Sequence, residues 1–489
     1  MADNRPVNGR GEESLPLVHQ SNAKEVERVA PIEEVGSLAD EVKVVMRLVI
    51  PVVFTLLNEY VPAVTNIALV GHLVSPETKE HVAATAISSM LFNITSMSVG
   101  LGLATAMDTL CTQALGAGNP KKLGSYLQGG LLAMAMALVP VFVINWYSGW
   151  IFESLHQDAA ISAMAGTFTR YSTMGLPFLC VYELVKRLLQ AHHITWPTAV
   201  VAVLGNVIHI GVGYYLVNFT SYGFVGAAVG RSVAYVCLPF LVLPYFWWHP
   251  VHEDWTIQWS FRDAWTAMPA FLEFGVPGMV AMVAEWGAFE MLTLLSGLMP
   301  DHTIVLGVNS ILMTIISLVY MLFWGVSTAA CMRVGFFLGG NQPAKAKQVA
   351  VLCYSITFGC CLCTAALLVL TRDCLPKLFV DEIDVVRRSV TALLFVIPCH
   401  MIDSMNCVTT GVLRAMGKQQ IGVVVLTTAY YAVGIPFAAL CGLYFGWSVE
   451  GLWMGFTCGT TVAFVTYAVQ LRAINWTQQA HEAAARSLE

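Results

Sequence analysis

Long apolar segments recur along this chain from about residue 45 to about residue 471. A helix needs about 20 mainly apolar residues to cross the hydrocarbon core of a bilayer, and these segments are about that long. Short polar stretches separate them. The pattern predicts an all-α integral membrane protein with twelve transmembrane helices, at residues 45–70, 83–106, 126–149, 165–190, 197–217, 224–247, 271–296, 304–330, 349–370, 386–413, 421–445 and 449–471.

The composition agrees with a membrane protein. Hydrophobic residues make up 57% of the chain, charged residues only 11%, and the mean hydropathy is +0.67. A soluble domain carries nearer one quarter charged residues because its surface is wet. The net charge of −6 forms no basic stripe, so we expect no nucleic-acid partner. The 13 cysteines lie mostly in apolar segments, which predicts packing roles and neither a metal nor another cofactor.

The sequence contains an internal repeat. Four pairs of similar short segments are separated by 223 to 226 residues, as subtraction of their residue numbers shows. The paired segments begin at Leu115 and Leu338, Leu188 and Val412, Val49 and Gly275, and Val225 and Glu450. Six helices per half give the two halves the same orientation in the membrane, a parallel repeat found in some transporters. We therefore predict two pseudo-symmetric six-helix bundles.

The repeat and the polar stretches divide the chain into five parts. We predict a disordered cytosolic tail, a first lobe with helices 1–6, a cytosolic linker, a second lobe with helices 7–12 and a cytosolic C-terminal tail, at residues 1–44, 45–247, 248–270, 271–472 and 473–489. With both termini in the cytosol, the inner loops carry most of the Lys and Arg, as the positive-inside rule requires. These inner residues are Lys121, Lys122, Lys186, Arg187, Arg262, Arg333, Lys345, Lys347, Arg414 and Lys418.

Several carboxylates fall inside the apolar segments. A charge near the bilayer centre costs about 2.5–3.5 kcal/mol on insertion scales, so such residues usually face a water-filled cavity or a partner. Glu285 follows Pro277 by eight residues and Glu59 follows Pro51 by eight, which places the two acids at equivalent positions of the repeat. The complete set is Glu59, Glu183, Glu285, Glu290 and Asp403.

Each intramembrane acid has a structural reading and a functional one. An acid can be the satisfied partner of Ser, Asn or a buried Arg such as Arg231, and for Glu183 the nearby Lys186 keeps both readings open. For Glu285 and Asp403 we favour a proton-binding role, because a carboxylate in a cavity can hold a proton and release it to a cationic ligand. Glu290 is five residues from Glu285, about 140° round the helix, so we expect only one of them to face the cavity.

Aromatic residues near these acids are candidates for the substrate cavity. A flat or cationic ligand can stack on Trp286, Phe289, Tyr430 or Tyr431, and Asn406 is a further candidate. The alternative is that these rings pack in the core or face lipid. Neither the sequence spacing nor the residue types decide between the two.

The sequence resembles the multidrug and toxic compound extrusion (MATE) family, eukaryotic branch, over about residues 45–472. The segment from Met107 to Gly118 is similar to the family's signature after the second helix, and shorter similar segments follow in order. The signature-type residues are Asp108, Gln113, Gly116 and Gln190. The resemblance implies a V-shaped pair of six-helix bundles that exchanges organic compounds for protons or sodium. It also implies acidic coupling sites at Glu285 and Asp403, and Glu290 matches a position that is acidic in some animal members. Glu59 is unusual for the first helix of the family, and its position in the apolar segment alone makes it a further candidate.

The sequence leaves four possible functions. We expect a monomeric, proton-coupled antiporter that exports organic cations, xenobiotics or secondary metabolites from the plasma membrane or the vacuolar membrane. A flippase-like transporter of an amphipathic or lipid-linked substrate needs a cationic cavity, and Arg231 is the only arginine expected well inside a helix. An integral membrane enzyme needs a polar catalytic constellation, which the spacing does not provide. A nonconducting scaffold or receptor does not need proline-broken helices with midplane acids.

Overall fold

The computed structural model describes residues 38–73 and 76–488, so the predicted N-terminal tail lies almost entirely outside the described residues. Eleven helices in this part of the chain are long and apolar enough to cross a membrane. A twelfth span is broken into α7 and α8, neither of which reaches the length of a full crossing. The fold is thus all-α with twelve spans, as the hydrophobic pattern predicts.

The first six spans form one bundle. They are α2 (Leu38–Gly71), the continuous helix α3, η1 and α4 (Thr78–Phe92, Asn93–Met97 and Ser98–Gly116), α5 (Lys122–Trp146), α7 with α8 (Ala159–Thr173 and Leu176–Ala191), α9 (Trp196–Phe219) and α10 (Val225–Trp248). The short helix α6 (Ser148–Ser154) connects α5 to α7, and the 3-10 turn η2 (Val251–Trp255) follows α10.

The last six spans form the second bundle. They are α11 (Phe261–Gly297), α12 (His302–Gly339), α13 (Pro343–Thr371), α14 (Ile383–Ala415), the helix α15, η4, α16 and η5 (Gln419–Thr427, Thr428–Gly434, Ile435–Ala439 and Leu440–Tyr444) and α17 (Ser448–Ala473). The turn η3 (Pro376–Leu378) precedes α14, and α18 (Trp476–Leu488) ends the described chain.

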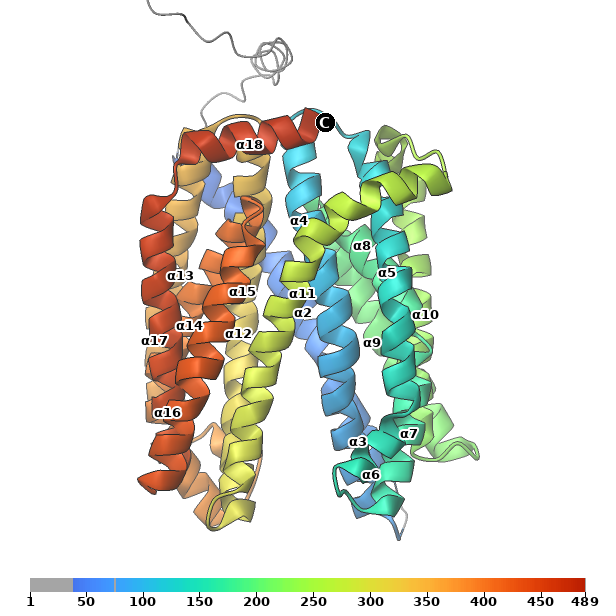
Figure 1. Cartoon of the computed structure of the whole chain (residues 1–489). Helices are drawn as coiled ribbons and strands as arrows, with labels where there is room; N and C mark the ends of the chain where they lie inside the picture. Colours follow the sequence, from blue (N-terminus) through green and yellow to red (C-terminus); the bar gives the residue numbers. More distant parts are fainter. Residues whose placement is uncertain (1–37, 74–75, 489) are drawn as a thin grey trace, which may run out of the picture.

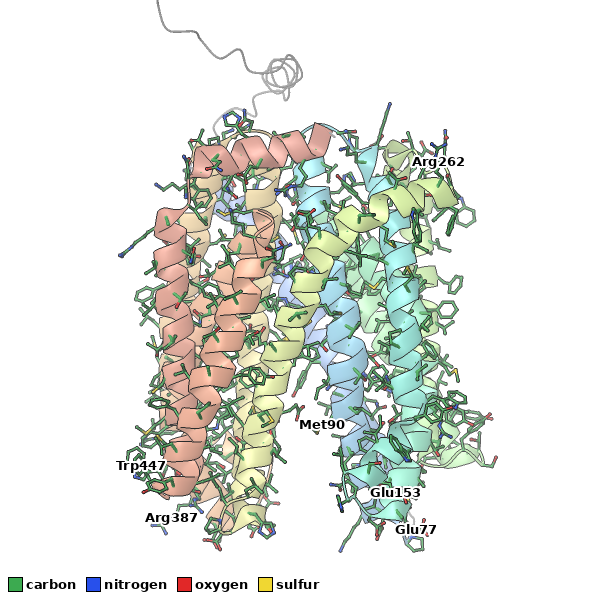
Figure 2. All side chains as sticks on the ribbon, in the orientation of Figure 1. Glu77, Met90, Glu153, Arg262, Arg387 and Trp447 are labelled. Carbon is green, nitrogen blue, oxygen red and sulfur yellow. The ribbon has the colours of Figure 1, made fainter. Side chains whose placement is uncertain are left out.

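The two bundles form a V. Their helices lie together at the end of the molecule that carries α18 and diverge toward the opposite end, as Figure 1 shows. Arg262 lies at the closed end, whereas Glu77, Glu153 and Arg387 lie at the open end (Figure 2). The junction is built from α11 against α4 and from α2 against α12. At the first crossing a Cβ on Gly102 would collide with the backbone of Met279, so glycine permits the close approach.

Several helices extend well beyond the apolar segments that predict them, such as α4, which continues to Gly116, ten residues past the predicted end at 106. Helix α11 begins at Phe261, ten residues before the predicted start at 271, and α12 continues to Gly339, nine residues past the predicted end at 330. Hydropathy detects only the lipid-embedded part of a helix, because polar residues can continue the backbone hydrogen bonds outside the bilayer. In α12, for example, Arg333 pairs with Glu41 of α2, with 2.6 Å between Nη2 and Oε1.

The C-terminal segment beyond the last span is helical. Helix α18 lies across the closed end, nearly perpendicular to the spans (Figure 1). It packs against α12, α13 and α4. One face is buried, with Ala480 and Ala483 fully covered, while His481 and Glu482 are exposed. The segment predicted only as a tail is therefore an amphipathic helix that covers the closed ends of both bundles.

Candidate functional site

A cavity of about 420 Å³ lies between the two bundles. Helices α2, α4, α8, α9 and α10 of the first bundle and α11, α12 and α14 of the second contribute side chains to its wall. Every intramembrane acid identified in the sequence lines it: Glu59, Glu183, Glu285, Glu290 and Asp403. The fold thus gathers five carboxylates from four helices into one space.

The acids of the second bundle are held by tyrosines. Tyr320 Oη of α12 donates to Glu285 Oε1 at 3.0 Å. Tyr430 Oη of η4 donates to Asp403 Oδ1 at 2.9 Å. Within the described residues, neither acid forms an ion pair with Lys, Arg or His. Because η4 is a π-helical turn, a feature common at functional sites, it changes the direction of the side chains that follow α15 and helps to aim Tyr430 at Asp403.

The acids of the first bundle are held by a lysine. Lys186 Nζ lies 2.6 Å from Glu59 Oε1 and 2.6 Å from Glu183 Oε1, and its side chain is only 3% exposed. Adding the 224-residue offset that relates Leu188 to Val412 places Thr410 at the position equivalent to Lys186. The two bundles thus present similar acids to the cavity, but among the described residues only the cavity acids of the first bundle form an ion pair with a buried cation.

The expectation that only one of Glu285 and Glu290 faces the cavity is wrong. Both line it, although they diverge by about 140° round α11. The reason is the position of α11 at the junction, where it packs against α4 and α5 of the first bundle and against α12 and α15 of the second. A helix at the edge of two bundles exposes a wide arc to the space between them.

The aromatic candidates divide into two groups. Trp286 and Phe289 line the cavity. Tyr430 is fully buried behind Asp403, and Tyr431 is 39% exposed with its hydroxyl near Gly287, so neither is part of the cavity wall. The same holds for Asn406, whose Nδ2 donates to the carbonyl oxygen of Thr460 at 3.0 Å inside the second bundle. In this conformation Tyr430 and Asn406 pack inside the second bundle, whereas Tyr431 is exposed outside the cavity.

A smaller pocket of about 80 Å³ lies on the closed side of the cavity. Glu285, Trp286, Tyr320 and Trp324 line both spaces, so the Glu285 carboxyl stands at the boundary between them. Arg414 lines the smaller pocket as well, but its Nη1 is 3.2 Å from Asp108 Oδ2. The cavity acid and the ion pair at the closed end are therefore neighbours across one small pocket.

Comparison with known proteins gives the family. The MatE family model matches residues 51–215 and 277–440, two segments that correspond to the internal repeat and together cover more than half of the chain. The chain belongs to the MATE family. This membership makes it a membrane transporter of the multidrug and toxin extrusion type rather than an enzyme.

Relatives from animals and plants align over almost the whole chain. The multidrug and toxin extrusion protein 2 of Mus musculus is 27% identical and covers 92% of this chain and 78% of its own length. Protein DETOXIFICATION 9 of Arabidopsis thaliana is 27% identical, with 91% and 92% covered. The crystal structure of the eukaryotic MATE transporter AtDTX14 superposes with a TM-score of 0.86 at 28% identity, over 92% of this chain and 100% of that one.

The signature-type residue Asp108 holds this MATE transporter closed at one end. Arg187 Nη1 of α8 donates to Asp108 Oδ1 at 3.1 Å and to Oδ2 at 3.0 Å. Arg414 Nη1 of α14 donates to Oδ2 at 3.2 Å. Asp108 is 6% exposed, so this is a largely desolvated ion triad that joins the two bundles. Its carboxylate accepts from both bundles at once.

The other signature-type residues serve the same contact. Gln113 Nε2 donates to the carbonyl oxygen of Ala415 at 2.7 Å, and its Oε1 accepts from Arg486 Nη1 of α18 at 2.8 Å. A Cβ on Gly116 would collide with the backbone carbonyl of Phe336, so glycine lets α4 touch α12. Gln190 is buried at the end of α8. These residues fit the helices together at the closed end.

The prediction that four cations lie in inner loops is wrong. Lys186, Arg187, Arg333 and Arg414 are buried within α8, α12 and α14, with side chains 3%, 5%, 5% and 11% exposed. A helical signal was present for one pair, because Glu183 and Lys186 are three residues apart and share a helix face. The carboxylate partner of both Arg187 and Arg414, Asp108, is more than 75 residues away in the sequence, and this distant contact left no such signal.

Proposed function

We propose that this MATE transporter is a proton-coupled antiporter that exports organic cations, xenobiotics or secondary metabolites by alternating access of its two bundles. One observation carries the proposal. Glu285 and Asp403 face a single cavity, and each is held by a tyrosine hydroxyl rather than by a fixed cation. The second bundle therefore offers a negatively charged site that either a proton or a cationic ligand can neutralise. Binding of one weakens binding of the other.

The physical argument is competition. Two carboxylates in one cavity repel each other, so the pair is stabilised by taking up a proton or by binding a cation. An organic cation that enters the cavity favours the ionised pair and releases the proton. After the cation has left on the outer side, proton uptake restores the neutral pair. Each ligand thus promotes the departure of the other, as exchange requires.

The first bundle is the natural contrast. Glu59 and Glu183 share the ammonium of Lys186, so a fixed counterion stands beside them, whereas no Lys, Arg or His among the described residues forms an ion pair with Glu285 or Asp403. We therefore assign coupling to Glu285 and Asp403, a structural role to Glu59, and an auxiliary role in cation attraction to Glu290. A proton suits a site with few oxygen ligands better than sodium, which prefers several.

The orientation is part of the proposal. The closed end carries the C-terminus and the basic residues Lys121, Lys122, Lys345, Lys347 and Lys418, which favours the cytosolic side for this end. The cavity then faces the outer or lumenal side of the plasma membrane or the vacuolar membrane, with both termini in the cytosol. Both cavity walls come from one chain, which supports a transporter that works as a monomer.

The flippase-like alternative predicts a cationic cavity. Five carboxylates line this one, against the single arginine Arg231. This ratio favours a cationic group on the substrate, and we do not propose lipid flipping.

A transport assay tests the proposal. A pH gradient is imposed across proteoliposomes, and a fluorescent organic cation is supplied outside them. We expect the cation to accumulate inside against its own concentration gradient. Glu285→Gln and Asp403→Asn should each lower this accumulation at least about 10-fold, because amides cannot exchange the proton. Glu59→Gln is the matched control, since it makes the same change beside Lys186, and it should retain most of the activity. Equal loss in all three variants, or none in any, contradicts the assignment of coupling.

A further inference from the structure

Arg231 is a buried cation in the wall of the transport cavity. It lies in α10, six residues from the start of the helix, and is 4% exposed. It lines the same cavity as Glu285 and Asp403, but from the opposite bundle. The role proposed above for the acids makes no use of it.

The partners of Arg231 leave most of its hydrogen-bonding capacity unused. Its Nε donates to Tyr235 Oη at 2.8 Å. Its Cζ lies 4.5 Å from the centre of the Phe92 ring and 5.4 Å from that of Tyr235, so the two rings hold the guanidinium in place. A guanidinium has five N–H groups, and within the described residues only this one hydrogen bond is present. No carboxylate in that part of the chain forms an ion pair with it.

Other buried cations of the molecule are paired. Lys186 contacts Glu59 and Glu183, and Arg187 contacts Asp108. Arg333 and Arg414 have their own carboxylates in Glu41 and Asp108. Burying a charge without an anion is costly, and aromatic faces offset only part of that cost. Arg231 therefore differs from these four, because no carboxylate of the described residues offsets the free energy needed to bury its charge.

We infer that Arg231 forms an anion-binding subsite in this cavity, and that the transporter takes substrates carrying a carboxylate or another oxyanion together with a cationic group. The fork of the guanidinium matches two oxygens of a carboxylate, sulfonate or phosphate. Phe92 and Tyr235 restrain that fork before the ligand arrives. The inference rests on the proposed export function and narrows its substrate class to zwitterionic amphiphiles.

The two poles of such a ligand would lie on different bundles. Its anionic group pairs with Arg231 of the first bundle, and its cationic group approaches Glu285 and Asp403 of the second. The cavity volume of about 420 Å³ is in the range of sites for drug-sized molecules, and Trp286 and Phe289 supply apolar surface between the poles. A ligand that contacts both bundles favours a conformation in which the bundles lie closer together. A simple cation contacts mainly the second bundle.

The test compares two dyes that differ only at the anionic group. A rhodamine with a free carboxylate and its methyl ester share the same cationic ring system, so the ester is a matched probe without the anion. Binding of both is measured by fluorescence polarisation to purified transporter in nanodiscs, for wild type, Arg231→Gln and Arg231→Lys. We expect R231Q to weaken binding of the free acid about 10- to 100-fold, the range for a hydrogen-bonded charge, and to leave the ester within about twofold.

The outcomes separate this inference from the proposed function. Ester binding by R231Q shows that the variant is folded, and loss of acid binding alone supports the subsite. Equal weakening for both dyes, or none for the acid, overturns it. If R231Q binds neither dye, R231K decides, because it keeps the charge: acid binding reduced more than ester binding supports the subsite, and equal reduction overturns it. Uptake of the ester driven by a pH gradient in wild type is a separate readout, and its absence would overturn the proposed function instead.

Discussion

At the scale of single residues, the two halves of the repeat differ at the position of Lys186. Lys186 neutralises acids of the first bundle, and the equivalent position in the second bundle is Thr410. Thr410 lines the small pocket next to Glu285. The repeat therefore produces similar carboxylate positions, while a single side chain separates a fixed ion pair from a site free to exchange its counterion.

Substituting Thr410→Lys tests this difference. The new ammonium would stand in the pocket of Glu285 and favour its ionised form, as Lys186 does for Glu59. We expect accumulation driven by a pH gradient to fall about 10-fold or more, because the site no longer needs a proton to be neutral. Thr410→Val removes the hydroxyl without adding charge and should transport normally. A fully coupled T410K protein in the proteoliposome assay would contradict the role given to Glu285.

At the scale of elements, α18 connects the end of the chain to the first bundle. Arg486 Nη1 donates to Gln113 Oε1 of α4, and its Cζ lies 5.0 Å from the ring centre of Phe274 in α11. Near the C-terminal end of α18, the backbone carbonyls of Arg486 and Ser487 accept from Lys122 Nζ and Asn119 Nδ2. A cation at the C-terminal end of a helix is favourable, because the helix dipole is negative there. The helix thus bridges the bundles from outside the membrane.

We expect Arg486→Ala to loosen the closed end. One hydrogen bond to a charged group contributes about 1.5–3 kcal/mol, so the equilibrium should shift about 10-fold or more toward an open inner side. The measurement is the rate at which a maleimide modifies Cys331, which is 1% exposed beside Asp108, in a variant retaining only this cysteine. His481→Ala changes the exposed face of the same helix and should not alter the rate. An unchanged rate in R486A would show that α18 does not restrain opening.

At the scale of the whole molecule, the V is held by buried charges at its closed end. The triad of Asp108, Arg187 and Arg414 joins α4 and α8 to α14. The alternating access that we propose requires this contact to separate, which would expose the three charges to water. Buried ion pairs contribute little net stability compared with apolar packing, but they lose little on hydration, so they suit an interface that must open and close repeatedly.

Asp108→Asn should open that interface. It leaves two buried arginines without their anion, and breaking a buried pair costs about 3–5 kcal/mol. We expect Cys331 to react with maleimide at least about 100-fold faster and uptake to decline as the closed end fails to re-form. Asp254→Asn, in the turn η2 at the same end of the molecule, removes an equal charge away from the triad and serves as the control. Protection of Cys331 in folded D108N protein would refute the gating role.

Sequence patterns predicted the architecture well and the site in part. The order of the helices agrees with the apolar segments, but several helices, among them α2, α4, α11 and α12, extend seven to ten residues beyond the predicted bounds. The repeat correctly related Glu59 to Glu285, and both reach the cavity. The partners Tyr320, Tyr430 and Lys186 could not be assigned, since a side chain's neighbours across a bundle depend on helix rotation. Glu290 also lines the cavity, although its separation from Glu285 round the helix predicted that only one of the two would do so.

The sequence by itself determined the membrane fold, the twofold repeat and the presence of costly intramembrane acids. These follow from local properties, because burial in lipid requires long apolar helices and any charge within them needs a reason. Only the tertiary structure decided which charges meet. It paired Lys186 with Glu59, Arg187 and Arg414 with Asp108, and left Arg231 at the cavity wall with no carboxylate partner in the described part of the chain. Helix packing makes those choices, since contacts between distant segments depend on three-dimensional position and not on spacing along the chain.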